Sequence, residues 1–310
     1  MSSNNTTATL PKPHRIHWVA SIPFFLVHAT VGLIYFTGFK WQYAALMLGS
    51  YYFRMIGVTI GYHRYFSHRA FQTNRVFQFL LAFWAETSSQ KGVLWWAANH
   101  RHHHKFSDQP EDVHSPLQSG FWWSHVGWIL STQYEETKFD AIKDFARYPE
   151  LRFLNKHHWV PTVVYAAAML ALFGLPGLVW GFFLSTVLLW HGTFTINSLS
   201  HVFGNRRYLT TDTSRNNALL ALITCGEGWH NNHHYYQNTA NQGWFWWEVD
   251  LSYYTLKLFS VLGLVKKLRL PPEQTKMAFK HYTPAEKARL RTISVEIPAQ
   301  VLPPPVVEPV

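Results

Sequence analysis

Uncharged apolar runs alternate along this chain with polar segments that are rich in histidine. The first run extends from Trp18 to Phe39, and the second, from Gln42 to Tyr62, is interrupted only by Arg54. A third apolar region covers residues 157–205 and is divided by the turn signal Gly174-Leu-Pro-Gly177. About 20 apolar residues in a helix match the hydrocarbon thickness of a bilayer. The pattern therefore predicts four membrane-spanning helices, at about residues 18–39, 42–62, 159–175 and 178–197.

The polar segments between these runs predict a helical cap on the cytoplasmic face, formed by residues 63–158 and 198–270. Phe77–Ala85 is apolar but too short to cross, so we expect a core or interfacial helix there. The expected fold is all-α, with one membrane domain over residues 18–270. A polar arm, residues 1–17, precedes this domain. Residues 271–310 are expected to form a largely disordered tail, whose end is rich in Pro and Val.

The alternative to a membrane domain is a large soluble protein with buried core helices. Charged residues make up only 14% of the chain, against roughly 25% in ordinary soluble domains. Core helices are also rarely uncharged over more than about 18 residues. Both observations favour the membrane protein, and the mean hydropathy of −0.10 averages its apolar spans with its polar cap.

Basic residues gather on one side of the predicted topology. The chain has 27 Lys and Arg against 17 Asp and Glu, a formal net charge of +10. With four spans, both termini and residues 63–158 share one side, which holds all the basic residues except Lys40 and Arg54. The positive-inside rule places that side, and both termini, in the cytoplasm. The charge is thus a topology signal, and because no nucleic-acid-binding module is present, no nucleic-acid partner is expected.

Histidines are concentrated at the cytoplasmic ends of the predicted spans. Two groups share the spacing H-x-x-H-H, and positions i, i+3 and i+4 lie on one face of a helix. A pair five residues apart follows the second span, and another histidine closes the fourth. Neutral imidazole binds zinc, copper, iron or nickel, so the spacing predicts a metal centre, with more ligands than one ion needs. The candidate ligands are His63, His68, His100, His103, His104, His201, His230, His233 and His234.

The remaining histidines share no such spacing, and we expect structural roles for them. His102 points off the face that its neighbours share. Two others lie within predicted spans, where a buried polar group normally contacts another helix or a cavity. The histidines assigned here are His28, His102, His114, His125, His157, His158 and His191.

Four stretches of the chain resemble the integral-membrane fatty acyl desaturases, in particular their delta-9, stearoyl-CoA desaturase-like branch. The stretches are residues 57–69, 99–107, 120–128 and 226–234, the last reading Gly226-Glu-Gly-Trp-His-Asn-Asn-His-His234. The likeness extends from about residue 18 to residue 270. It implies a di-iron centre held by the nine candidate histidines, with Asn197 approaching one iron through water. It implies no catalytic residue beyond the metal ligands.

The resemblance also implies a reaction. Such enzymes use O2 and two electrons to introduce a cis double bond, here expected at delta-9, into a saturated long-chain acyl substrate. Tyr51 and Met55 match positions near the closed end of the substrate tunnel in this family. An Arg-Lys pair near the CoA in animal members is replaced by Ser131-Thr-Gln-Tyr-Glu-Glu136. The acyl carrier therefore stays open between CoA, a lipid and a carrier protein.

Electrons must come from a separate protein. The single cysteine, Cys225, cannot build an iron–sulfur cluster, and no haem-binding His-Pro-Gly-Gly stretch is present. A ferredoxin or a cytochrome b5 is the expected donor. Basic residues that offer a docking surface for an acidic partner are Arg206, Arg207, Lys266, Lys267 and Arg269.

Two other functions are compatible with parts of the sequence. A membrane di-iron hydroxylase would use the same oxidant to add oxygen to an alkyl chain. A metal transporter would need ligands inside the membrane, whereas the histidine groups fall outside the predicted spans.

Overall fold

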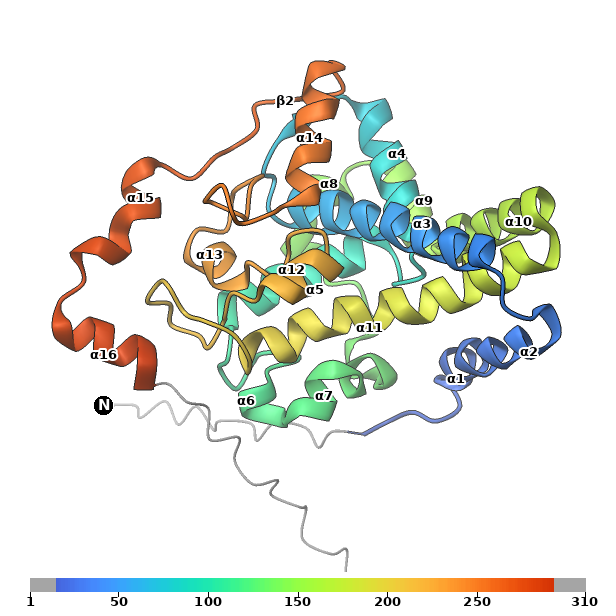
Figure 1. Ribbon diagram of the computed structural model, residues 1–310, viewed down its shortest axis with the longest axis horizontal. Coiled ribbons are helices and arrows are strands. Elements are labelled where there is room, and N and C mark those ends of the chain that lie inside the picture. The colour runs from blue at the N-terminus through green and yellow to red at the C-terminus, as the bar shows by residue number, and fades with distance from the viewer. Residues whose placement is uncertain (1–14, 293–310) are drawn as a thin grey trace, which may run out of the picture.

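The computed structural model describes residues 15–292, which fold mainly into helices (Figure 1). The first apolar run forms three consecutive helices, α1 (Ile22–Ala29), η1 (Thr30–Leu33) and α2 (Ile34–Thr37). The second forms α3 (Trp41–Gly57), which continues directly into a π-helix, η2 (Val58–Ser67). The mainly α-helical class is confirmed. In the described part of the chain, two short strands, β1 (Gln72–Thr73) and β2 (Val265–Lys266), pair antiparallel.

The third apolar region forms a helical hairpin. It comprises α10 (Trp159–Pro176), η6 (Gly177–Leu184), α11 (Ser185–Asn197) and η7 (Leu199–His201). Gly174, with φ 64° and ψ −156°, breaks α10 at the predicted turn, in a conformation that glycine adopts without a steric cost. Within residues 15–292, one apolar segment, Trp159–His201, is long enough to cross a membrane, and Ile22–Thr37 is apolar but shorter. The four-span arrangement therefore stays a prediction.

Polar contacts join the apolar helices to one another. α3 packs against η6 and α11, and the buried Arg54 of α3 donates hydrogen bonds to Thr186 Oγ1 (2.7 Å) and Ser185 Oγ (2.5 Å). These bonds satisfy the two terminal nitrogens of a charged group whose burial would otherwise be costly, whereas its Nε has no partner among the described residues. His28 Nε2 lies 3.1 Å from His191 Nε2, so these two histidines connect α1 to α11.

The cap contains the short helices before and after the hairpin. α4 (Arg75–Glu86) covers the helix predicted around Phe77–Ala85 and begins at Asn74, whose side chain accepts from the Phe77 amide (2.9 Å). The larger cap helices that follow are α5 (Val93–Phe106), α9 (Pro149–Lys156), α12 (Ala218–Ile223), α13 (His230–Tyr235) and α14 (Leu251–Val261). Single turns complete it: α6 (Pro116–Ser119), α7 (Phe121–His125), η3 (Gly127–Leu130), η4 (Thr132–Tyr134), η5 (Phe139–Ile142) and α8 (Lys143–Ala146).

The segment after residue 270 differs from its expected disorder. Its described part forms α15 (Glu273–Met277), η8 (Ala278–His281) and α16 (Pro284–Thr292), at the opposite end of the molecule from α1, α2 and α10 (Figure 1). Tyr208 donates from its hydroxyl to the Lys276 carbonyl (2.7 Å), and Thr283 and Glu286 form a reciprocal capping box. Residues 273–292 of the segment expected to be largely disordered form helices in the structure, which are held by a contact from Tyr208 and by a local capping box. Residues 1–14 and 293–310 of the predicted arm and tail lie outside the described residues.

Candidate metal centre

The π-helix η2 aligns the first pair of candidate ligands. His68 donates its backbone amide to the His63 carbonyl (3.2 Å), the i to i+5 bond that defines this geometry. The ring centroids of the two histidines lie 4.7 Å apart. Residues five apart diverge on an ordinary α-helix, so the wider turn brings both imidazoles to the same side.

Five histidines from three elements converge on one point. His63 of η2 and His68, which caps its C-terminal end, meet two histidines of α5 and one of α13. The Nε2 atoms of neighbouring rings are 2.9–3.0 Å apart in each observed pairing, namely His63–His233, His68–His100, His100–His104 and His104–His233. One ligand atom from each ring lies within 4.8 Å of all the others. We call this set the five-histidine group.

A second group contains four histidines from α5, η7 and α13: His103, His201, His230 and His234. His201 Nε2 and His230 Nε2 are 3.1 Å apart. His234 Nε2 is buried and has no hydrogen-bond partner among the described residues. A buried acceptor of this kind is costly unless something occupies the space beside it, and a metal ion satisfies that need. The nine predicted ligands thus separate into two sets, five and four.

Four buried carboxylates hold the outer nitrogens of these histidines. The Nδ1 atoms lie beside an acidic oxygen in the pairs His63–Glu227 (2.5 Å), His103–Asp112 (2.9 Å), His201–Asp108 (3.3 Å) and His234–Asp212 (2.8 Å). A carboxylate at Nδ1 fixes the proton there and leaves Nε2 as the ligand atom. The sequence analysis missed all four. Glu227 lies within the 226–234 stretch, but the aspartates carried no recognisable signal.

Burial keeps the inner histidines neutral. It lowers the pKa well below the usual value for His68, His100, His104, His230 and His233, and nearby imidazoles lower it further. Burial acts to raise the pKa of Asp212, but His234 holds it below its usual range. Neutral imidazoles backed by ionised carboxylates are the protonation states in which histidine binds a metal.

Several other histidines lie near this centre without joining either group. The His114 ring is 4.3 Å from that of His103, and its Nδ1 lies 3.9 Å from Asp112, so it is closer to the site than its sequence position suggested. His102 contacts the Glu111 carbonyl, away from the metal groups. His125 lies 3.0 Å from His191 and extends the contact between α7 and α11.

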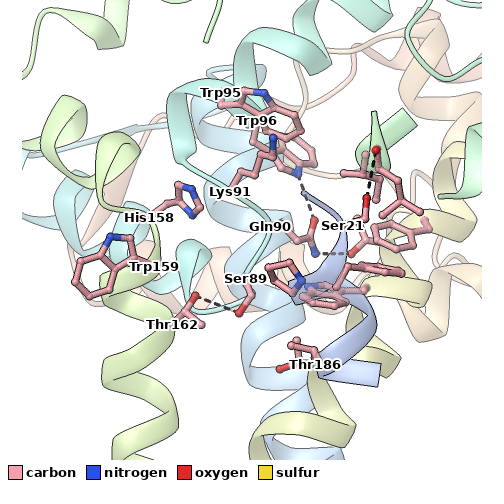
Figure 2. A pocket seen from close by; sticks show the side chains of 18 of the residues that line it. Ser21, Ser89, Gln90, Lys91, Trp95, Trp96, His158, Trp159, Thr162 and Thr186 are labelled. Carbon is pink, nitrogen blue, oxygen red and sulfur yellow. Dashed lines mark hydrogen bonds between the residues drawn. The ribbon is translucent and has the colours of Figure 1, made fainter. Parts of the chain in front are cut away.

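An apolar cavity of about 530 Å³ leads to the five-histidine group. Its walls come from α1, α10, η6 and α11, and His100 and Asn197 line its inner side. Trp96 donates to Gln90 Oε1 (3.3 Å), and Gln90 donates to Thr193 Oγ1 (3.0 Å) across one wall (Figure 2). The lining of the cavity is mainly apolar, as a hydrocarbon chain requires.

The remaining predicted residues occupy different positions. Tyr51 and Met55 are buried against Gly192 of α11 and are not among the residues that line this cavity. Arg206 is buried and donates to the Asp212 carbonyl (2.8 Å), and Arg207 is ion-paired with Glu248. The expected basic docking surface is therefore reduced to its exposed members, Lys266, Lys267 and Arg269.

Converging histidines beside an apolar cavity define a candidate metal centre with room for an apolar ligand. Residues 39–259 match the fatty acid desaturase family, and the chain belongs to that family. The protein is thus a fatty acyl desaturase of a family that uses iron.

Individual relatives support this assignment. The chain is 35% identical over 265 residues to the sn-2 palmitoyl-lipid 9-desaturase of Nostoc sp., covering 84% of this chain and 93% of the relative. It is 40% identical over 232 residues to the sn-1 stearoyl-lipid 9-desaturase of Synechocystis sp., with 73% and 70% covered. It is 37% identical over 233 residues to an acyl-CoA 5-desaturase of Anemone leveillei, with 73% and 72% covered.

Proposed function

We propose that this protein is a di-iron acyl-lipid desaturase that introduces a cis delta-9 double bond into a saturated glycerolipid acyl chain. The single observation that carries the proposal is the pair of histidine groups, five and four, beside an apolar cavity. Two distinct ligand sets favour two ions over one. A lipid carrier is favoured because relatives named as 9-desaturases act on palmitoyl and stearoyl lipids.

The reaction removes two hydrogens from adjacent methylenes. A saturated chain, one O2, two electrons and two protons give the alkene and two waters. When bound, the irons would supply oxygen activation and hydrogen abstraction. The protein's own residues hold the ligands through the carboxylate pairs, exclude water and place a C–H bond beside His100 and Asn197. For Asn197 we propose contact with one iron through water.

For the membrane arrangement we propose four spans, with the termini and both histidine groups in the cytoplasm. The helices α1, α2 and α10 present large apolar side chains outward, among them Phe36, Leu172 and Val163. Extensive exposed apolar surface is unfavourable in water and expected in lipid. A lipid bilayer is thus the proposed surrounding of these helices.

A separate ferredoxin or cytochrome b5 is the proposed electron donor. The donor would dock on the exposed cations Lys266, Lys267 and Arg269, which offer electrostatic complementarity to an acidic partner.

Expression in a desaturase-deficient host tests the function. We expect new monounsaturated lipids whose double bond, located by mass spectrometry, lies at C9, with a loss of two hydrogens per chain. A gain of one oxygen instead would identify a hydroxylase. Metal uptake without any change in lipids would point to a transporter. A His233→Ala variant serves as the inactive control.

A further inference from the structure

A second cavity lies beside the acyl cavity and shares part of its wall. It measures about 640 Å³ and is bordered by α9, the start of α5 and the loop before η5. Residues that line both cavities are Lys91, Trp95, Glu135 and His158. Figure 2 shows three of them, Lys91, Trp95 and His158, at the end of the acyl cavity away from Thr186. The four shared residues place the polar cavity directly beside the apolar one.

The second cavity carries an excess of positive charge. Arg152 and Lys156, four residues apart on one face of α9, line it together with Lys91. None of these three cations forms a salt bridge with another residue in the 15–292 range. Glu135 is the one carboxylate in the lining. Such a surface favours an anionic ligand over a neutral sugar.

Aromatic rings and a hydrogen bond hold this charged wall in place. The Arg152 guanidinium lies 5.2 Å from the centre of the Phe139 ring, and Lys91 Nζ lies 4.8 Å from that of Trp95. Asn155 accepts from the Trp95 amide (2.8 Å) and so connects α9 to α5. Arg152 and Lys91 are therefore positioned by ring contacts before any ligand arrives, which lowers the entropic cost of binding.

In the proposed membrane arrangement, the second cavity lies where an apolar helix begins. His158 lines it, and the next residue, Trp159, begins the apolar helix α10. Tryptophan favours the interface between lipid and water, and basic pockets at the cytoplasmic ends of spans bind anionic headgroups. CoA also carries phosphates, so an acyl-CoA is the alternative occupant, which the assay below distinguishes from a lipid.

We infer that the second cavity binds the phosphodiester of an anionic glycerophospholipid whose acyl chain occupies the neighbouring cavity. This inference rests on the proposed acyl-lipid function. Arg152 is the main phosphate ligand, because its planar guanidinium can donate two parallel hydrogen bonds to phosphate oxygens. Lys91 and Lys156 add positive charge to the lining of the same cavity.

Lipid retention measured by native mass spectrometry tests this site independently of turnover. Purified protein is exchanged into micelles that contain equal amounts of phosphatidylglycerol, phosphatidylcholine and monogalactosyldiacylglycerol with identical saturated chains. We expect selective retention of phosphatidylglycerol. Arg152→Gln and Lys156→Gln should each lower that selectivity about fivefold, and Arg152→Lys should retain most of it. Lys143→Gln, an exposed cap cation outside this cavity, is the matched control.

The outcomes separate this inference from the proposed function. Equal retention of the three lipids, or unchanged selectivity in both glutamine variants, would overturn the headgroup site even if the enzyme desaturates lipids. Selective retention by wild type that is lost in the variants supports the site. A parallel assay in which acyl-CoA is desaturated and glycerolipid is not would overturn the acyl-lipid function. It would also overturn the assignment of this cavity to the headgroup of a lipid substrate.

Discussion

His103 Nδ1 lies 2.9 Å from Asp112 Oδ1, which directs the opposite ring nitrogen of His103 toward the four-histidine group. Asp112 is buried and also accepts hydrogen bonds from the backbone amides of Asp108 (2.9 Å) and His114 (3.3 Å). One carboxylate therefore sets the orientation of a ligand ring and of the loop beside it. The geometry of the candidate metal centre depends on this residue, although it belongs to neither the five-histidine nor the four-histidine group.

Replacing Asp112 with Asn should weaken iron binding without removing a ligand. The amide is nearly the same size but carries no charge, so it orients His103 less firmly, and loss of such a partner typically lowers metal affinity by roughly 10- to 100-fold. Iron per protein, measured by plasma mass spectrometry after dialysis against a graded chelator, checks this. Asp140→Asn, at a highly exposed carboxylate, is the control. Iron retention equal to wild type would show that Asp112 has no positioning role.

Alanine substitutions in the two histidine groups should report on the number of ions. His103 belongs to the four-histidine group and His233 to the five-histidine group. We expect either His103→Ala or His233→Ala to abolish desaturation and to lower the iron content, because each leaves one ion with an incomplete ligand set. His102→Ala should keep both, since its ring contacts the Glu111 carbonyl instead. Normal turnover in either group variant would refute the ligand assignment.

Local spacing was sufficient to predict some features of the site. The i, i+3, i+4 pattern placed His100, His103 and His104 on one face of α5, and Gly174 was recognised as the turn of the hairpin. Within this face, however, His100 and His104 join one group and His103 the other. The division depends on where η2, η7 and α13 approach α5, which spacing along a single helix does not contain.

Long-range partners and local helix type could not be predicted. Asp108 and His201 are 93 positions apart, and only the fold brings them together. The alignment of His63 with His68 depends on a π-helix, for which the sequence offered no rule beyond convergence at a helix end. The helices after residue 272 depend on a capping box at Thr283 and on a hydrogen bond from Tyr208, neither of which the overall composition of the segment reveals.

The length of the acyl chain should depend on residues that face the cavity. Ala166 of α10 lines the cavity, whereas Met55 packs on Gly192 of α11 and does not line it. Ala166→Phe should therefore shift the products toward shorter chains. Overpacking costs about 1–3 kcal/mol, which corresponds to roughly a 5- to 150-fold change in preference. Gas chromatography of the products formed from mixed chain lengths measures this ratio.

Met55→Ala tests the alternative that came from the family resemblance. If the chain ended beside α3, removal of this side chain would lengthen the preferred substrate, and Ala166→Phe would leave the profile unchanged. That combined result would place the closed end of the tunnel at Tyr51 and Met55 rather than between α1, α10 and α11. We expect Ala166→Phe to shift the products toward shorter chains and Met55→Ala to leave the profile unchanged, because the lining of the cavity includes Ala166 and excludes Met55.

Stability should decrease as the pH rises because of Glu86. This carboxyl is fully buried at the end of α4 and accepts from the Val93 amide (2.9 Å), and burial raises its pKa from 4.5 to about 8. The folded protein thus binds this proton more tightly than the unfolded chain does. The stabilising contribution is complete below about pH 4.5 and is lost as the pH rises to about 8, at up to about 1.4 kcal/mol per pH unit.

Glu86→Gln keeps the acceptor but cannot ionise, so it should melt above wild type at pH 8 and close to it at pH 5. Thermal unfolding in detergent at both pH values measures the difference, with the exposed Glu136→Gln as control. A Glu86→Gln variant that gains no stability relative to wild type between pH 5 and pH 8 would show that Glu86 is ionised in the folded protein.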